Sequence, residues 1–420
     1  MIFYSSHQLG TKAPDSIRSS ADPKSMNRPK HRQRRLVLLL LYTWCILFGK
    51  YFLQPRLNRR MRLDRGRKMC SVILNTLCIK LEIHMLAYQL LDYGTPESHA
   101  LNDVAVPTPA ADEVVIQNEA IGLNYPDLLM VQGLYQKRPE PPFIPGRDSA
   151  GTVISVGADV TAFKPGDRVV AQTFTGGFAE QVLAPVNRVF HRPEGVSAVD
   201  AAGAITVFNT AFVAASIRAG VKKGDRVVVT GAAGGVGAAA IQVAHNLGAE
   251  VVAIVSSEEK AALARASGAQ QTLIIADRSE DALKAFFKKD VRTAWGDDKG
   301  ADVVIDTVGG TMFQAGLRCL GFAGRMVVVG FASGDIPAAK TNYLLYNNLS
   351  VMGAPLDIHF DYALDQIRGG TDWWLNLLSQ GKAVANVTKQ IPFAELMQGL
   401  ADIRDQKVVG KIVVTLGSSE

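Results

Sequence analysis

A glycine-rich stretch near the middle of the chain suits the binding of a pyrophosphate. It reads Gly231-Ala232-Ala233-Gly234-Gly235-Val236-Gly237 and lies between an apolar stretch, 226–230, and an Ala-rich stretch, 236–246. A pyrophosphate must approach the backbone closely and bind the free N–H groups at a helix N-terminus, so side chains there must be absent or very small. We therefore predict that Gly234, Gly235 and Val236 bind a dinucleotide. The alternative is a Gly-rich turn of another α/β protein.

The next predicted strand, 250–255, indicates which dinucleotide would bind. An NAD site commonly has an Asp or Glu about 20 residues after its glycines, where it binds the ribose hydroxyls. Here the strand is followed by Ser256 and Ser257, and Lys260 comes one turn into the next helix. Hydroxyls and a cation suit the 2′-phosphate of NADPH, which an acid would repel. The alternative is that Ser256 caps this helix, with Glu259 as its capping-box partner and Lys260 in solvent.

The pattern of predicted secondary structure differs before and after this candidate site. Before it, short strands separated by Gly, Pro and Asp turns predict a mostly β domain. From Ala201 onward, strands alternate with helices, which predicts a parallel, doubly wound sheet. The expected strands are 114–116, 151–156 and 168–171 in the first part and 226–230, 250–255, 302–306 and 325–329 in the second. The expected fold is therefore α/β, with a mostly β domain beside a Rossmann-type domain.

The first 84 residues differ from the rest in composition. They hold 17 Lys and Arg against 4 Asp and Glu, so in a chain of net charge +6 the remainder carries −7. The basic excess thus gives no reason to expect nucleic-acid binding by the folded body. Only four cysteines are present, which excludes a disulfide scaffold.

An apolar run in this leader, 36–48, raises the question of a membrane. It is shorter than the roughly 20 residues of a membrane span, and Lys50 follows it closely. A signal-anchor, an organellar targeting peptide and a stretch foreign to the natural protein are all compatible with it. A fresh start at Met85, directly before a predicted strand, would give a cytoplasmic protein. Membrane attachment is expected only if residues 36–53 act as an anchor.

The order of these parts resembles the medium-chain dehydrogenase/reductase superfamily. A β-rich part precedes the dinucleotide motif, and a return strand, 411–414, ends the chain. The stretch 224–237, continuing to Gln242, is similar to the signature of the zinc-independent quinone oxidoreductases, the zeta-crystallin-like family. His245 departs from that signature. It lies outside the glycine-rich stretch 231–237, which we call the phosphate loop. The resemblance implies a GroES-like catalytic domain (85–205 and 350–420) and a Rossmann-type NADP-binding domain (206–349) in a homodimer.

A second stretch that is similar to the superfamily concerns a possible zinc site. Zinc alcohol dehydrogenases have a Cys and a Gly-His-Glu motif where this chain has Asn124 and Gly146-Arg147-Asp148, and a cluster of four structural cysteines is missing. Zinc needs soft ligands at close spacing, so no metal is expected. Quinones and α,β-unsaturated carbonyls can be reduced without one, because conjugation spreads the charge that arrives with the hydride.

The resemblance also suggests roles for individual residues. Asn124 and Tyr125 would lie beside the nicotinamide and a small electrophilic substrate, where Asn124 donates a hydrogen bond and Tyr125 orients the substrate or supplies a proton. Asp127 is grouped with them as catalytic. The alternative for this Asn-Tyr-Pro-Asp stretch is an ordinary turn. Further cofactor contacts are expected at Thr210, Gly330 and Phe331.

Three other functions remain open from the sequence. An enoyl-thioester (enoyl-CoA) or alkenal double-bond reductase would use the same cofactor and cleft. A non-catalytic NADPH-binding sensor would keep the phosphate loop but lack turnover. A membrane-tethered form of the reductase would depend on the leader.

Overall fold

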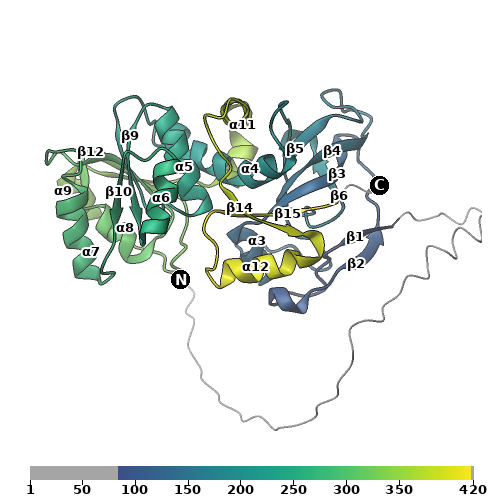
Figure 1. Ribbon diagram of the computed structural model, residues 1–420, viewed down its shortest axis with the longest axis horizontal. Coiled ribbons are helices and arrows are strands. Elements are labelled where there is room, and N and C mark those ends of the chain that lie inside the picture. The colour runs from purple at the N-terminus through teal and green to yellow at the C-terminus, as the bar shows by residue number, and fades with distance from the viewer. Residues whose placement is uncertain (1–83, 418–420) are drawn as a thin grey trace, which may run out of the picture. The chain divides into compact units, whose positions relative to one another are not determined.

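The computed structural model describes residues 84–417, in which two β-sheets lie on either side of a long central helix (Figure 1). The predicted leader, apart from His84, lies outside the described residues, as does its apolar run 36–48. The first described strand is β1 (His84–Ala87), which pairs antiparallel with β2 (Asn102–Ala105). The strand predicted after Met85 is thus present but short.

One sheet is six-stranded and entirely parallel. Its spatial order is β10-β9-β8-β11-β12-β13, and each neighbouring pair runs parallel. Its strands are β8 (Arg226–Val229), β9 (Glu250–Val255), β10 (Gln271–Ile274), β11 (Ala301–Asp306), β12 (Leu320–Val328) and β13 (Ser350–Gly353). The strand order reverses between β8 and β11, and open α/β sheets bind ligands at such a reversal. The predicted doubly wound sheet is confirmed, and β13 is the strand at one of its edges.

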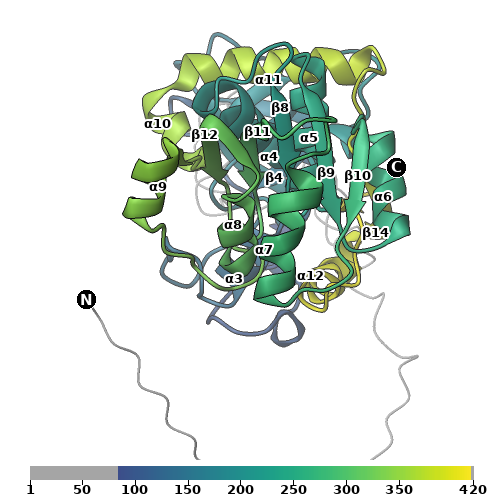
Figure 2. The same ribbon diagram turned by 90° about the vertical axis from the view of Figure 1, so that its left-hand side faces the viewer.

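Helices cover both faces of this sheet because the side chains of a strand alternate between its two faces. Val227 and Val229 of β8 pack in one apolar cluster, whereas Val228 between them packs in another, with Phe287 and Phe313. The helices here are α5 (Gly235–Asn246), α6 (Glu258–Ala266), α7 (Glu280–Phe286), α8 (Gly310–Gly316) and α9 (Thr341–Asn347). Figure 2 shows β8 to β12 side by side among them.

The second sheet is seven-stranded and mostly antiparallel. It follows the order β14-β15-β3-β4-β5-β7, with β6 paired to β3. Its strands are β3 (Glu113–Gly122), β4 (Asp148–Val156), β5 (Arg168–Gln172), β6 (Gln181–Pro185), β7 (Val189–His191), β14 (Val387–Pro392) and β15 (Lys411–Thr415). Strands β14 and β15 come from the far end of the sequence, and β15 pairs with β3 at Gly122. Residues 413–415 are thereby placed beside residues 120–122.

Helix α4 (Ala198–Phe212) joins the two sheets, and a π-helical turn, Val213–Arg218, continues it. Its residues belong to an apolar cluster that also holds Ala150 of the antiparallel sheet and Val229 of the parallel sheet. The segment Ala198–Arg218 is long and apolar enough to cross a membrane, yet 83% of its apolar window is buried inside the protein. Its apolar surface is accounted for by the core.

The remaining helices border the antiparallel sheet and the central helix. They are α3 (Tyr125–Val131), α10 (Leu356–Tyr362), α11 (Leu364–Ser379) and α12 (Leu396–Arg404). In α11, Trp374 is fully buried against Phe208, with ring centroids 5.4 Å apart, and Trp373 packs on Phe212 at 5.7 Å. The apolar face of this helix therefore packs into the core.

Candidate active site

The predicted phosphate loop connects β8 directly to α5, at the reversal in strand order. Gly234 is the N-cap of α5. The backbone N–H groups of Val236 and Gly237 have no acceptor among the described residues, as expected for the first turn of a helix. These N–H groups and the positive end of the helix dipole form a site for an anion such as a pyrophosphate.

Close backbone packing explains the glycines of this loop. A Cβ atom on Gly237 would lie 2.2 Å from the carbonyl oxygen of Gly231, a contact that no side chain tolerates. Gly231 itself has a φ of 61°, in the left-handed region that favours glycine. Gly234, with a φ of −76°, has only that same carbonyl nearby, at 3.3 Å from a Cβ position. The space above Gly234 therefore remains open for a ligand.

A buried carboxylate that the sequence analysis did not single out fixes the neighbouring loop. Asp306 ends β11, and its oxygens accept from the backbone N–H groups of Val308 and Gly309, both at 3.1 Å. Thr230 also donates to Asp306, at 2.5 Å. Burial raises the pKa of Asp306. The carboxyl ends of β8 and β11 are thereby joined beside the phosphate loop.

The predicted 2′-phosphate ligands meet at the end of β9. The ammonium of Lys260 donates to Ser256 Oγ at 3.0 Å, so the cation and the hydroxyl lie together where an NAD site would have an acid. The cap of α6 is Ser257, which accepts from the Lys260 backbone at 3.3 Å. The alternative in which Ser256 is the cap is therefore wrong. Because Ser257 is the cap, Ser256 Oγ is available to a ligand.

The predicted catalytic stretch forms the start of α3, where its three residues have different environments. Asn124 precedes the helix and is buried, Tyr125 is 43% exposed, and Asp127 is fully buried. One oxygen of Asp127 accepts from the Asn124 backbone at 2.9 Å, and the other has no partner. The stretch thus caps α3, and this cap carries an unsatisfied carboxyl oxygen.

The side chain of Asn124 is held at both ends by buried charged residues. Its Oδ1 accepts from Lys411 Nζ at 2.7 Å, and its Nδ2 donates to Asp148 Oδ2 at 2.9 Å. Lys411 also donates to the Leu123 carbonyl at 2.6 Å. Lysine only donates, and an ionised carboxylate only accepts, so these partners fix which end of the carboxamide is which.

A buried chain of hydrogen bonds continues from Asp148 into the core. Thr206 donates to Asp148 at 2.6 Å, and Gln172 donates to Thr206 at 2.5 Å. Asn209 donates to Gln172 at 3.4 Å and accepts from Trp374 at 2.7 Å. Thr371 also donates to Asn209, at 2.8 Å. We call this chain, with Asn124 and Lys411, the Asn124 network.

Burial dominates the electrostatics of the Asn124 network and of the adjacent Asp127. It raises the pKa of Asp127 to about 7, with the nearby Asp148 adding to the shift and Arg147 and Lys411 opposing it. Burial likewise raises the pKa of Asp148 and lowers that of Lys411. Each charged form is costly here, and Asp127 can therefore hold a proton near neutral pH.

Arg147, which stands where zinc enzymes have a histidine, has protein partners of its own. It is buried and forms an ion pair with Asp357 of α10. Tyr135 donates to the same carboxylate at 3.2 Å, and the Arg147 guanidinium lies 5.6 Å from the centre of the Phe174 ring. Within residues 84–417, no group of three or more His, Cys, Asp or Glu side chains could hold a metal ion.

The other predicted cofactor residues lie on the elements that border the site. Thr210 is in α4, one turn after Thr206, and its hydroxyl donates to the Thr206 carbonyl at 2.7 Å. Gly330 and Phe331 follow β12, and Phe331 lies against Gly309 of the neighbouring loop. A Cβ on Gly330 would meet only an ordinary contact, 3.7 Å from the Thr307 carbonyl. The protein itself thus does not require glycine at position 330.

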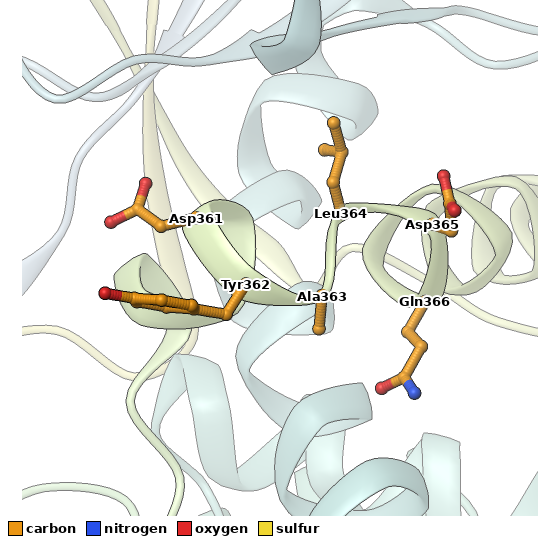
Figure 3. Close-up of a pocket in the computed structure, with 6 residues that line it drawn as sticks. All are labelled: Asp361, Tyr362, Ala363, Leu364, Asp365 and Gln366. Carbon is orange, nitrogen blue, oxygen red and sulfur yellow. The ribbon is translucent and has the colours of Figure 1, made fainter.

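A surface hollow lies elsewhere, at the junction of α10 and α11. It has a volume of about 380 Å³. It is lined by Asp361, Tyr362, Ala363, Leu364, Asp365 and Gln366 (Figure 3). Their side chains point in different directions rather than toward one centre. None of them belongs to the phosphate loop or to the Asn124 network.

Two domain families match the chain. A model of the alcohol dehydrogenase GroES-like domain matches residues 110–194, and one described as zinc-binding dehydrogenase matches residues 235–357. The first range covers most of the antiparallel sheet, and the second begins at the phosphate loop. Fold and site therefore define an oxidoreductase of the medium-chain dehydrogenase/reductase superfamily.

Similar proteins indicate which family within this superfamily the chain belongs to. Quinone oxidoreductase-like protein 2 of Bos taurus is 35% identical over 305 residues, which are 72% of this chain and 85% of that protein. Quinone oxidoreductase of Mus musculus is 35% identical over 249 residues, 59% of this chain and 73% of that protein. The chain belongs to the quinone oxidoreductase family.

Solved structures agree with this assignment. A mycobacterial protein in complex with NADPH is 30% identical, with a TM-score of 0.71, and the match covers 79% of this chain and 99% of that one. The quinone oxidoreductase of Escherichia coli, also in complex with NADPH, is 25% identical, with a TM-score of 0.70 over 79% of this chain and 99% of that one.

Proposed function

We propose that this protein transfers hydride from NADPH to a quinone or a related α,β-unsaturated carbonyl, without zinc. The observation that carries the proposal is that a fixed hydrogen-bond donor, the Asn124 carboxamide, is tied to the phosphate loop. Its partner Lys411 follows Gly410, and Gly410 forms a β-bridge with Gly234 of that loop. A donor for a substrate oxygen is therefore held close to where the cofactor phosphates would bind.

The residues present fit NADPH. The open space at Gly234 and the free N–H groups of α5 suit its pyrophosphate, and Ser256 with Lys260 suits its 2′-phosphate. Two solved relatives are complexes with this cofactor. When bound, NADPH supplies the hydride, and one proton from the protein or solvent completes the reduction of a quinone to its hydroquinone.

The chain's own residues would bind the substrate and handle its charge. Asn124 would donate its remaining N–H to the substrate oxygen, on which negative charge develops. Tyr125, at the exposed end of α3, would orient the substrate or pass it a proton. Arg147 is engaged by Asp357, so it would shape the pocket rather than act on the substrate.

The test is NADPH oxidation by the purified chain with an ortho-quinone, a para-quinone, an enal and an enoyl-CoA in parallel. Turnover of a quinone that persists with a chelator supports the proposal. Turnover of only the enal or the enoyl-CoA would favour a double-bond reductase instead. Tight NADPH binding without any turnover would contradict both and indicate a sensor.

A substitution of Lys260 tests the preference for NADPH over NADH. Lys260→Met should weaken NADPH binding at least about tenfold and leave NADH binding nearly unchanged, because it removes a charged partner of the 2′-phosphate. Lys284→Met is the matched control, since Lys284 pairs with Glu280 within α7 and belongs to neither β9 nor α6. Equal losses for both cofactors would contradict the assignment of Lys260.

The predicted homodimer and cytoplasmic location stay predictions. Strand β13 forms an edge of the parallel sheet, and an edge strand offers free backbone groups to a second sheet. Equilibrium sedimentation of the chain and cell fractionation would test the two predictions separately.

A further inference from the structure

The C-terminal strand β15 begins with a lysine that sequence reasoning treated only as part of a return strand. Lys411 is almost fully buried, yet the apolar core does not surround its ammonium group. Instead, Nζ binds two oxygens of adjacent residues, the Leu123 carbonyl at 2.6 Å and Asn124 Oδ1 at 2.7 Å. Burying an ammonium group is costly unless it is well paired, so a buried lysine at this position calls for an explanation beyond packing.

The methylene groups of the Lys411 side chain pack on the phosphate loop. A Cβ placed on Gly235 would lie 3.1 Å from Lys411 Cδ, so the stem runs directly along the first turn of α5. The preceding residue, Gly410, forms the β-bridge to Gly234. One side chain therefore touches the phosphate loop with its methylene groups and Asn124 with its charge.

We propose that Lys411 is a positioning residue, which holds the Asn124 carboxamide so that its N–H end, and not its oxygen, is available to the substrate. This inference rests on the proposed function, in which Asn124 donates to the substrate oxygen. Lys411 binds Oδ1 and Asp148 binds one N–H, and the second N–H of Asn124 has no acceptor among the described residues. A flipped carboxamide would direct its oxygen at the carboxylate of Asp148.

The charges around Lys411 support this role. Asp127 and Asp148 are the carboxylates that act on its ammonium, and both are fully buried. Arg147 also acts on the two carboxylates but is paired with Asp357. Lys411 is therefore the cation that compensates them beside Asn124. Without it, the carboxamide loses the contact that distinguishes its two ends.

The first experiment compares the full chain with its Lys411→Met variant, because methionine keeps much of the stem that packs on Gly235. With the electrophile that the wild type reduces best, kcat should fall about 100-fold, the size of effect seen when an oxyanion donor is lost. The dissociation constant for NADPH should change less than about threefold. A parallel loss of NADPH affinity and kcat would overturn the proposal, because Lys411 would then act through the phosphate loop alone.

Two further variants separate positioning from general stability. Lys389→Met is the matched control, because Lys389 lies on the neighbouring strand β14 and pairs with Asp402 at 2.6 Å, outside the Asn124 network. Its kcat should stay within about twofold of the wild type. The double variant Lys411→Met/Asp148→Asn removes one buried charge of each sign. It should recover thermal stability lost in Lys411→Met, while kcat stays low.

A readout without turnover keeps this inference distinct from the proposed function. In chain labelled with ¹⁵N at asparagine, the side-chain signal of Asn124 is assigned by its loss in Asn124→Ala. Lys411→Met should shift that signal and speed the rotation of the amide, and Lys389→Met should leave it unchanged. If the wild type reduces no electrophile, the proposed function fails, but this signal still decides the role of Lys411. An unchanged signal, or an unchanged kcat in a folded Lys411→Met protein, would overturn it.

Discussion

The phosphate loop and the Asn124 network adjoin each other through Gly410 and Lys411, yet they are built from different parts of the chain. The loop consists of consecutive residues, and its contribution comes from backbone N–H groups and from the absence of side chains. The network joins side chains of residues as distant in sequence as Asn124 and Lys411. Each of its members is defined by a partner that lies far away along the chain.

This difference teaches how each region responds to change. A backbone site fails by steric exclusion, because an added carbon atom has nowhere to go. A side-chain network fails by loss of a partner, which leaves a buried polar group unsatisfied. The following predictions separate the two modes of failure, from the largest expected effect to the smallest.

The largest effect is expected for Gly237→Ala in the phosphate loop. The new Cβ would lie 2.2 Å from the backbone oxygen of Gly231, so α5 would have to move away from β8. We expect NADPH affinity to fall by more than about 100-fold and stability by about 3 kcal/mol, as overpacked sites do. Isothermal calorimetry and urea unfolding measure the two.

Gly234→Ala sharpens the same prediction. The nearest atom to its Cβ is 3.3 Å away and the backbone has an ordinary negative φ, so the fold should tolerate it. The added methyl group would occupy the space proposed for the pyrophosphate. Unfolding should change little while NADPH affinity falls. Equal stability losses in the two variants would contradict the steric explanation.

In the Asn124 network, Asp148→Asn should lower kcat by about 10- to 100-fold with a smaller change in NADPH affinity. Asp148 accepts from Asn124 with one carboxylate oxygen and from Thr206 with the other, and an amide has an oxygen at only one of these two positions. Steady-state kinetics and NADPH binding distinguish these effects. Thr206→Val removes only one donor to Asp148, so its kcat should lie between those of the wild type and of Asp148→Asn. A greater loss of kcat than in Asp148→Asn would contradict this prediction.

A third prediction concerns the distal end of the network. Asn209→Gly should lower the free energy of unfolding by about 1 to 3 kcal/mol, because the buried indole N–H of Trp374 loses its acceptor. Urea unfolding measures the change. Thr371→Val should cost less, since the oxygen of Asn209 keeps its bond from Trp374 and no buried donor loses its acceptor. If Thr371→Val costs as much as Asn209→Gly, the loss reflects packing instead.

The smallest effect, when it is expressed per pH unit, is a pH dependence carried by Asp127. Its pKa of about 7 in the folded protein exceeds its ordinary value of 3.8, so folding retains a proton that the unfolded chain releases. The stability that Asp127 contributes is therefore present below about pH 4 and is lost as pH rises through about 7. Asp127→Asn should flatten the fall in unfolding free energy between these values by up to about 1.4 kcal/mol per pH unit.

Unfolding titrations at several pH values would measure that slope, with Asp402→Asn as control. Asp402 has a lowered pKa, caused first by its hydrogen bond with Lys389, so its own contribution is lost only at lower pH. The control should keep the wild-type slope near neutrality. A wild-type slope in Asp127→Asn would show that Asp127 is ionised throughout this range.

The sequence by itself determined the parallel sheet, the phosphate loop and the Ser256–Lys260 pair. Each depends on residues close together along the chain: glycines placed between a strand and a helix, or a serine and a lysine one helical turn apart. The bounds predicted for the strand at 250–255 match those of β9. Local sterics and hydrophobic periodicity are sufficient for such features.

Only the tertiary structure decided what Asn124 contacts. No regular spacing in the sequence relates Asn124, Asp148, Thr206 and Lys411. In the sequence Lys411 is one residue of a predicted terminal strand, and only the pairing of β15 with β3 places it beside Asn124. Asp306 and Asn209 were missed for the same reason, because a lone polar residue at the end of a strand or in an apolar helix has no local signature. The physical cause is that burial and long-range pairing give these groups their chemistry, and both arise only when distant segments pack together.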